Sequence, residues 1–411
     1  MLYKQGKIQC KPSEIGYDEN RLDVLNSHFN SLVEDGTLYC ATYCISRKGK
    51  VFAHGGIGYK TYEKDPAQPV SPTDVHYIAS MTKTFAGVAI MKLVEDGITT
   101  LEIPVGEILP QFDSPPFNGI TLFHLLTHTS GMHADRGCFE NKHNQGGYWH
   151  FIEQAYGAYL NKQKSGKASA SAKAAAKTAS AKFDWISAAL AHGVRTETGK
   201  EWAYCSFGFT ILGAVIEKLT GIHAHKYIED SICKPLGLND TGFALTPEMA
   251  KKYILQSKDS KKYAADTISG KPLKRDEMWD AIPRTGGGMK STVWDVVRYG
   301  NMMLHGGSFD GVRILGRKAV EKMTAISITK PDYCWNPAGS VRNYAIGFDH
   351  RNGPQFSFSD STFMHEGAGA CALYIDPCEE LVAAWIVPYA KEGWFPKAMY
   401  NPVNIIWSGL L

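Results

Sequence analysis

Strand-like segments lie at both ends of this chain and are separated by a long helical middle, which restricts the fold to a few architectures. Two β-rich runs, 38–46 and 51–57, are joined by Arg47-Lys48-Gly49-Lys50 and predict a hairpin. A second strand pair, 370–375 and 381–387, lies around Asp376-Pro377. Helical stretches flank these pairs, an amphipathic one over 18–34 and an apolar one over 398–410. We therefore predict an α/β (α+β) fold in which an antiparallel sheet, flanked by helices, is completed by both ends of the chain.

The middle of the chain, roughly 80–236, is predicted to be mostly helical, with 85–96 and 207–220 the clearest segments. We expect one domain over 1–411, with an α/β part from about 1–79 and 280–411 and a helical part from about 80–279. The functional site is expected between the two parts. Residues 161–182 are almost entirely Ala, Ser, Lys and Gly, which predicts an exposed insertion, either mobile or a solvated helix.

Composition excludes several classes of protein. The chain has 44 basic and 41 acidic side chains and no basic cluster interleaved with aromatic residues, so nucleic acid is not an expected partner. No run of about 18 apolar residues and no signal-like start is present, so we expect a cytoplasmic protein without a membrane partner. Nine cysteines without a Cys-x-x-Cys pair indicate neither a disulfide framework nor a zinc site, and Cys40 and Cys44 are expected in the core.

The strongest chemical signal is a Ser-x-x-Lys sequence, Ser80 to Lys83, at the start of a predicted helix. Residues three apart share one helix face, so the amine can reach the hydroxyl, and the helix N-terminus favours developing negative charge. A serine hydroxyl needs a base, and an amine serves only if desolvation or nearby positive charge lowers its pKa. Taken alone, the tetrapeptide is common by chance, and its usual interpretation is a helix cap followed by a surface lysine.

Further segments occur in the order typical of one family. They are 120–131, which contains His124-Leu125-Leu126-Thr127-His128; 198–206, which ends in Tyr204-Cys205-Ser206; Gly286-Gly287-Gly288-Met289-Lys290-Ser291-Thr292; and His365-Glu366-Gly367-Ala368-Gly369. Together with Ser80 and Lys83, this ordered set resembles the class C β-lactamases, the serine D,D-peptidases and the related esterases. The resemblance covers about residues 20 to 390.

The resemblance implies a role for each matching residue. Ser80 would be the nucleophile, Lys83 its proton partner and Tyr204 a second base. A phenolate near neutral pH requires adjacent positive charge, which Lys83 could supply. The oxyanion hole would come from the backbone N–H groups of Ser80 and Ala368. No metal and no organic cofactor is implied.

Substrate contacts are expected from Ser206, His365, Glu366 and Gly367. Two of these depart from the usual pattern, because Ser206 stands where β-lactamases and D,D-peptidases usually have Asn, and His365 where β-lactamases have Lys. Both departures weigh against β-lactam hydrolysis. A carboxylate at Glu366 would repel a substrate carboxylate, so we expect the enzyme to disfavour penicillins and peptides with a free carboxyl end. Alternation along a strand could instead point Glu366 away from the pocket.

Other residues have an unexceptional interpretation beside a functional one. His124 and His128 have a spacing that could suit a metal, but the resemblance makes them structural residues at a helix end. His223 and His225 are expected on the surface, and Cys205 in the packing. The aromatic residues Tyr148, Trp149 and Phe151 either line an acyl pocket or pack.

The expected reaction is acyl transfer through Ser80 on a small ester or amide. Carboxylesterase ranks first, D-amino-acid peptidase or β-lactamase second, and transfer to an alcohol or amine acceptor third. A catalytically silent binding or scaffold protein is the non-enzymatic alternative. The oligomeric state is not predicted.

Overall fold

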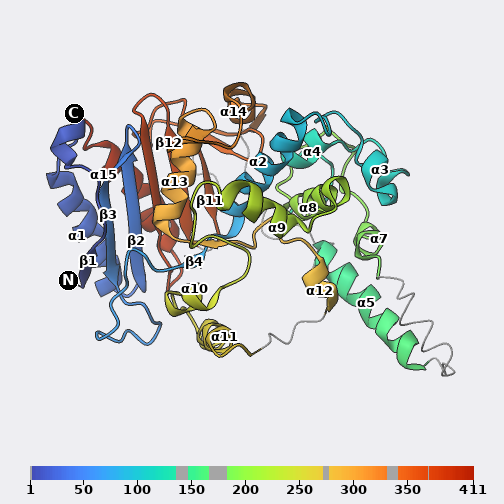
Figure 1. Ribbon diagram of the computed structural model, residues 1–411, viewed down its shortest axis with the longest axis horizontal. Helices are drawn as coiled ribbons and strands as arrows, with labels where there is room; N and C mark the ends of the chain where they lie inside the picture. The colour runs from blue at the N-terminus through green and yellow to red at the C-terminus, as the bar shows by residue number, and fades with distance from the viewer. Residues whose placement is uncertain (1, 136–146, 166–182, 272–276, 331–340, 369) are drawn as a thin grey trace.

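A nine-stranded antiparallel sheet runs through the computed structural model, which describes residues 2–135, 147–165, 183–271, 277–330, 341–368 and 370–411 (Figure 1). The order of the strands in the described residues is β1-β3-β2-β13-β12-β11-β10-β9-β8. Their bounds are β1 Tyr3–Gln5, β2 Cys40–Arg47, β3 Lys50–Gly58, β8 Ile328–Lys330, β9 Val341–Tyr344, β10 Asp349–Asn352, β11 Phe363–Gly367, β12 Cys371–Asp376 and β13 Leu381–Ile386. The predicted α/β (α+β) class with an antiparallel sheet is confirmed.

The two ends of the chain meet in the middle of this sheet. Strand β13 pairs with β2 over Leu381↔Arg47 to Ile386↔Thr42, so segments more than 300 residues apart lie side by side. The β2–β3 hairpin leaves only Lys48 and Gly49 between its last pair, with φ of 51° and 76°. Two positive φ values match the right-handed twist of the flanking strands, which explains the tight turn predicted there.

Side chains on the two faces of the sheet enter two different cores. One core holds Tyr374, Trp385 and Ala372 and is covered by α1 Asn20–Glu34 and α15 Asn401–Trp407, at the left of Figure 1. The other holds Leu373 and Ile375 and is covered by helices that include α2 Thr82–Glu95 and α13 Val293–Leu304. Successive residues of one strand point to opposite faces, which is why β12 serves both cores. Cys40 and Cys44 are both buried, as predicted.

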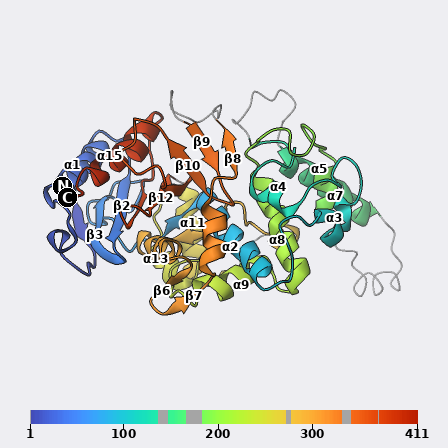
Figure 2. The same ribbon diagram turned by 90° about the horizontal axis from the view of Figure 1, so that it is seen from above.

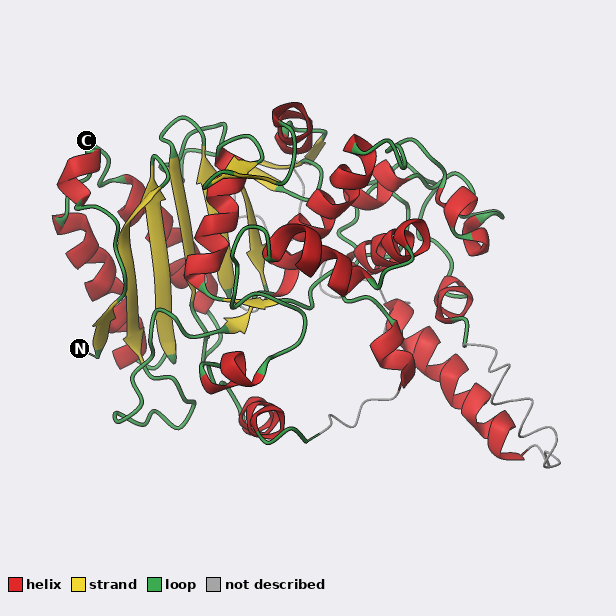
Figure 3. Ribbon diagram, viewed as in Figure 1, coloured by secondary structure: helices red, strands yellow, loops and turns green. Residues whose placement is uncertain are grey.

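A helical region packs beside the second core, on the side away from both chain ends (Figures 2 and 3). The other helices are α3 Val105–Ile108, α4 Leu122–Leu126, α5 Gly147–Ser165, α7 Trp185–Leu190, α8 Ser206–Thr220, α9 Ala224–Ile228, α10 Pro247–Lys251, α11 Lys258–Ile268, α12 Glu277–Ala281 and α14 Arg317–Thr324. Short strands β4 His76–Tyr77 and β5 Lys290–Ser291 pair with each other, as do β6 Ser308–Phe309 and β7 Val312–Arg313. Most of the low-complexity stretch predicted as an insertion, 166–182, lies outside the described residues.

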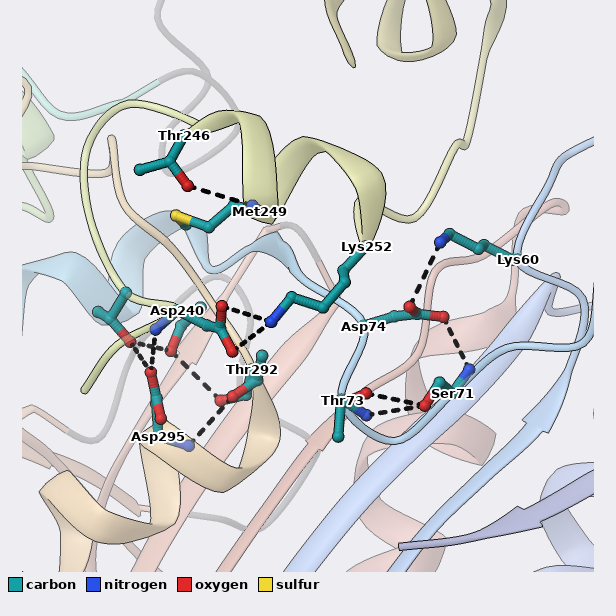
Figure 4. A network of polar contacts seen from close by, with 12 residues as sticks. Lys60, Ser71, Thr73, Asp74, Asp240, Thr246, Met249, Lys252, Thr292 and Asp295 are labelled. Carbon is teal, nitrogen blue, oxygen red and sulfur yellow. Dashed lines mark hydrogen bonds and ion pairs between the residues drawn. The ribbon is translucent and has the colours of Figure 1, made fainter. Parts of the chain in front are cut away.

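A buried polar network fixes the segment between α9 and α10 against α13 (Figure 4). The Asp295 carboxylate accepts hydrogen bonds from the Asp240 backbone N–H and the Thr241 hydroxyl, both at 2.9 Å. Lys252 in turn donates to both Asp240 carboxylate oxygens at 2.6 Å. Burial raises the pKa of Asp295 to about 6. This network anchors the chain that carries Phe243 to the wall of the pocket described below. Within the described ranges, no helix is both long enough and apolar enough to cross a membrane.

Candidate active site

Ser80 lies on a strained turn between a strand and a helix. Strand β4 leads into Ile78, whose backbone N–H donates to Met289 O at 3.0 Å. Ala79 then has a φ of 44°, a left-handed conformation that costs energy for a residue with a Cβ. The Thr82 hydroxyl holds the turn by donating to Ala79 O at 2.6 Å. Ser80 follows in a 3-10 turn, Ala79–Met81, that continues into α2, so the hydroxyl stands at the helix start as the sequence predicted.

Lys83 is fully buried on the first turn of α2, with its amine directed at Ser80. Its Nζ lies 3.0 Å from Ser80 Oγ, 2.8 Å from Ser206 Oγ and 2.6 Å from the carbonyl oxygen of Gly286. A surface lysine after a helix cap is therefore not the arrangement found. The helical spacing places amine and hydroxyl on one face, and two other segments complete the contacts.

A glycine is required where the Gly286 carbonyl approaches Lys83. A Cβ on Gly286 would lie 2.4 Å from the backbone oxygen of Ser206, far inside van der Waals contact. The 286–288 stretch can therefore pass directly against the start of α8 only without a side chain. This close approach brings Ser206 and the Gly286 carbonyl to one amine.

Asp135 belongs to the site and was not predicted from the sequence. Its carboxylate accepts the Ser206 backbone N–H at 2.8 Å and also the Ser206 hydroxyl hydrogen. Its own backbone N–H donates to Tyr204 O at 2.8 Å. It follows the Gly131 segment by four residues, where no motif spacing marks it. Only the fold brings it beside α8.

Tyr204 lies against both Ser80 and Lys83. Lys83 Nζ is 4.7 Å from the centroid of the Tyr204 ring, and the phenol hydrogen-bonds with the Ser80 hydroxyl. Burial nevertheless raises the pKa of Tyr204 well above its usual value, and the nearby Asp135 charge raises it further. The role of Tyr204 as a second base stays a prediction, and its raised pKa favours the phenol over the phenolate.

Neighbouring residues of β11 point to opposite sides of the sheet. The His365 ring faces the site, 6.5 Å from the Tyr204 ring between centroids, and burial lowers its pKa to about 4. Its Nδ1 lies 2.6 Å from Glu366 O, whereas its buried Nε2 has no hydrogen-bond partner among the described residues. The segment that begins at His365 thus presents a neutral imidazole rather than a fixed positive charge.

The Glu366 carboxylate points away from this site, which corrects its predicted role in substrate binding. Its oxygens accept from Arg351 Nη2 at 2.8 Å and from the Tyr374 hydroxyl at 2.7 Å. Tyr374 belongs to the core on the α1 and α15 face. The period of two along a strand explains the reversal, because residues on either side of His365 must face the other way.

The end of β11 lies against the nucleophile turn. A Cβ on Gly367 would be 2.5 Å from Ile78 O and 3.1 Å from the Ala79 Cβ, so only glycine permits this contact. Ala368, directly after it, lines the same pocket as Ser80. The oxyanion hole from the Ser80 and Ala368 backbone N–H groups stays a prediction.

A pocket of about 1020 Å³ opens in front of Ser80, Ser206 and Asp135. Its wall combines aromatic and charged side chains. The aromatic ones are Tyr77, Trp149, Phe243, Tyr263 and Trp279, and the charged ones include Lys226, Glu229, Asp280, Arg284 and Lys290. Of the three aromatic residues that the sequence left undecided, Trp149 lines the pocket, whereas the Tyr148 hydroxyl donates to Gly193 O and Phe151 stacks on His192.

His223 and His225, expected as ordinary surface residues, also line this pocket. His225 stacks on Phe243 with ring centroids 3.9 Å apart, and its Nε2 accepts the Arg284 backbone N–H at 2.7 Å. The sequence contains no spacing that relates His225 to Phe243 or Arg284. Its position in the pocket wall therefore could not be predicted from the sequence.

The remaining candidates have structural surroundings. Both ring nitrogens of His128 are engaged, Nε2 with the Tyr344 hydroxyl at 3.1 Å and Nδ1 with the Cys205 backbone N–H at 3.0 Å. His124 accepts the Thr121 backbone N–H at 3.1 Å at the start of α4. Burial raises the pKa of the Cys205 thiol to about 12, so it is no thiolate nucleophile. In the part of the chain that the structure describes, no three His, Cys, Asp or Glu side chains gather as a metal would require.

Comparison with known proteins identifies relatives in sequence and in fold. A family model described as Beta-lactamase matches residues 25–395. Protein flp of Staphylococcus aureus (strain N315) is 29% identical over 226 residues, which are 53% of this chain and 38% of that relative. The chain thus spans less than half the length of this curated relative.

Two solved structures share the fold at low identity. The structure of EstCE1, described as a hydrolase with promiscuous acyltransferase activity, gives a TM-score of 0.71 at 17% identity and covers 95% of this chain and 99% of that chain. A penicillin-binding protein homologue from Caulobacter crescentus gives a TM-score of 0.68 at 17% identity and covers 98% of this chain and 100% of that chain. At such identity the likeness concerns the fold alone.

Proposed function

The chain belongs to the Beta-lactamase family, and from this premise we propose that it is a serine hydrolase that cleaves small esters through an acyl-enzyme on Ser80. One observation carries the proposal. The Lys83 amine lies 3.0 Å from the Ser80 hydroxyl, and that hydroxyl lines an open pocket of about 1020 Å³. Nucleophile and base are thus within hydrogen-bond reach of each other and of a bound substrate.

The net result of acylation is the transfer of one proton from Ser80, through Lys83 and Tyr204, to the leaving alcohol. Ser80 Oγ attacks the ester carbonyl while its proton passes to neutral Lys83 Nζ. The tetrahedral oxyanion is stabilised by the backbone N–H groups of Ser80 and Ala368. When the carbon–oxygen bond to the leaving alcohol breaks, the Tyr204 phenol donates its proton to that alcohol and recovers one from Lys83. Water then attacks the acyl-enzyme by the reverse path and releases the acid.

The raised pKa of Tyr204 suits this division of roles. Burial raises the pKa of the Tyr204 phenol, which favours its role as a proton donor to a leaving alkoxide over a role as the base for the serine. Lys83, whose Nζ contacts Ser80 Oγ, is the group placed to receive the serine proton. The two side chains therefore act as one unit on one proton.

An ester with an apolar acyl or alcohol group fits the pocket best. Tyr77, Trp149, Phe243, Tyr263 and Trp279 offer aromatic faces for such a group. The imidazole of His365 is neutral and therefore supplies no fixed positive charge to the substrate. Ser206 has no amide and cannot both donate and accept as an asparagine side chain would. Both features support carboxylesterase over β-lactamase or D-amino-acid peptidase. The substrate is a small molecule, and the reaction needs no cofactor.

Covalent labelling tests this proposal. The wild-type protein is incubated with a fluorophosphonate and, separately, with a fluorescent penicillin, and the intact mass is measured. We expect one fluorophosphonate adduct on wild type, none on Ser80→Ala, little penicillin adduct, and full labelling of Ser31→Ala, a control in α1. An adduct that persists in Ser80→Ala would overturn the nucleophile. No adduct on wild type would favour a silent scaffold, and faster penicillin labelling would favour the β-lactamase or peptidase alternative.

A further inference from the structure

The Ser206 hydroxyl lies beside Lys83, and the direction of the hydrogen bond between them matters for catalysis. A serine hydroxyl carries one hydrogen and two acceptor lone pairs, so it can either accept from an amine or donate to it. Lys83 Nζ lies 2.8 Å from Ser206 Oγ. If Ser206 donated, its hydrogen would occupy the lone pair of neutral Lys83, and that lone pair is what must receive the Ser80 proton. The direction of this one hydrogen bond therefore decides whether the base is available.

Asp135 settles the direction. An ionised carboxylate only accepts hydrogen bonds. The Asp135 carboxylate takes the Ser206 hydroxyl hydrogen on one oxygen and the Ser206 backbone N–H at 2.8 Å on the other. With its hydrogen committed to Asp135, Ser206 Oγ can only accept from Lys83. Asp135 itself is held by its backbone, which donates to Tyr204 O at 2.8 Å.

Lys83 makes different hydrogen bonds to these partners as an ammonium and as a neutral amine. As an ammonium, Lys83 donates to Ser80 Oγ, Ser206 Oγ and Gly286 O, and all three can accept. As a neutral amine it has two hydrogens and one lone pair. The Gly286 carbonyl cannot donate, and Ser206 has given its hydrogen to Asp135. Among these three partners only Ser80 can donate to the lone pair.

We propose that Asp135 is a positioning residue that holds the hydroxyl hydrogen of Ser206 and so keeps it off the lone pair of Lys83, which must receive the Ser80 proton. The inference rests on the proposed function, because it concerns the base of that same acylation step. Asp135 needs no contact with the reacting atoms for this role. Its carboxylate sets the polarity of a chain of three hydrogen bonds: Asp135 accepts from Ser206, Ser206 accepts from Lys83, and Lys83 accepts from Ser80.

Asp135→Asn tests the polarity with almost no change in shape. The asparagine carbonyl can still accept the Ser206 backbone N–H, but its NH₂ group now donates to Ser206 Oγ. The Ser206 hydrogen then loses its acceptor and becomes free to donate to Lys83. We expect the single-turnover acylation rate with a p-nitrophenyl ester to fall by about 10² or more, the range of a lost general base, with KM little changed.

A rescue variant separates this role from a merely structural one. Asparagine at 206 has a carbonyl oxygen that accepts from Lys83 and no hydroxyl hydrogen to misdirect. Ser206→Asn in the Asp135→Asn background should therefore recover most of the acylation rate. In a Ser206→Ala background, Asp135→Asn should cause no further loss, because the residue through which it acts is gone.

Asp184→Asn is the matched control. The Asp184 carboxylate also accepts from a serine, from the Ser187 backbone N–H at 3.1 Å and the Ser187 hydroxyl at 2.7 Å, at the start of α7. This variant should acylate at the wild-type rate. Melting temperatures are measured for all variants.

Two results overturn the role of Asp135 while leaving the proposed function intact. One is a wild-type acylation rate in Asp135→Asn. The other is a slow Asp135→Asn that Ser206→Asn does not rescue, which would make the charge or the fold the cause. Absence of Ser80 labelling in the wild type overturns the proposed function and this role with it.

Discussion

His365 and Glu366 are adjacent in β11, but they differ in whether their polar atoms have hydrogen-bond partners. On the α1 and α15 face, the Glu366 carboxylate is bound by Arg351 and Tyr374, and the side chains of the ion pair are only 9% and 2% exposed. On the other face, His365 is equally buried, yet its Nε2 has no hydrogen-bond partner in the described part of the chain. Buried polar groups ordinarily have partners. The Glu366 carboxylate is thus matched inside the protein, whereas the buried Nε2 of His365 is unmatched among the described residues although His365 is not among the residues that line the pocket.

The same contrast holds for the tyrosines on the two faces. The Tyr374 hydroxyl donates to Glu366, a permanent partner. The Tyr204 hydroxyl contacts Ser80, whose own hydrogen must move during the proposed reaction. Burial raises the pKa of both phenols, so the pKa alone does not distinguish them. Their partners do, and variants on the two faces should separate stability from activity.

The largest expected difference is between Tyr204→Phe and Tyr374→Phe. Removing the Tyr204 hydroxyl takes away the proton donor, so kcat should fall by about 10²–10⁴ while the melting temperature changes little. Removing the Tyr374 hydroxyl leaves Glu366 Oε1 with only the 3.4 Å contact to Arg351 Nη1, which should cost about 1–3 kcal/mol of unfolding free energy with kcat preserved. Ester turnover and urea denaturation measure the two quantities. Equal losses of activity in the two variants would contradict the division between the faces.

A smaller but specific effect is expected from Arg351→Met. The substitution leaves Glu366 charged and buried without its ion-pair partner, which should lower the free energy of unfolding by about 3–5 kcal/mol. Adding Glu366→Gln should restore part of that loss, because the charge disappears. Activity per folded molecule should not change.

The exposed pair Lys318 and Glu321, 2.7 Å apart, offers the control for Arg351→Met. Lys318→Met should cost at most about 1 kcal/mol, as is usual for a solvated ion pair. A loss of that small size in Arg351→Met would mean that the Glu366 carboxylate is solvated or protonated in the folded protein.

The smallest effect is expected on substrate charge. Because Glu366 faces away from the pocket and is neutralised by Arg351, Glu366→Gln should leave the ratio of kcat/KM for a neutral and a carboxylate-bearing p-nitrophenyl ester unchanged. The measurement is made on the folded fraction, since the variant also loses an ion pair. If kcat/KM for the anionic ester rose relative to that for the neutral ester in Glu366→Gln, Glu366 would be shown to repel a substrate carboxylate, as the sequence suggested.

Local periodicity was sufficient for the framework of the fold. The apolar spacing of Leu25, Phe29 and Leu32 predicted α1, and the turn at Lys48 and Gly49 predicted the β2–β3 hairpin, because both depend on residues close in sequence. The contact between Ser80 and Lys83 has the same basis, since residues three apart meet on any helix. The family resemblance added Tyr204 and Ser206, which the fold brings to Lys83.

The tertiary structure determined which distant residues reach the site and which face of the sheet each side chain of β11 occupies. The sequence by itself determined the two-ended antiparallel sheet, the helical middle and the serine with its lysine. The face on which Glu366 lies depended on the register of β11 against β12, where a shift of one residue would reverse every side chain. Asp135, His225 and Trp149 reached the site through contacts between segments far apart in the chain. Such contacts leave no local pattern, because they depend on how helices and loops pack rather than on the spacing of residues within any one of them.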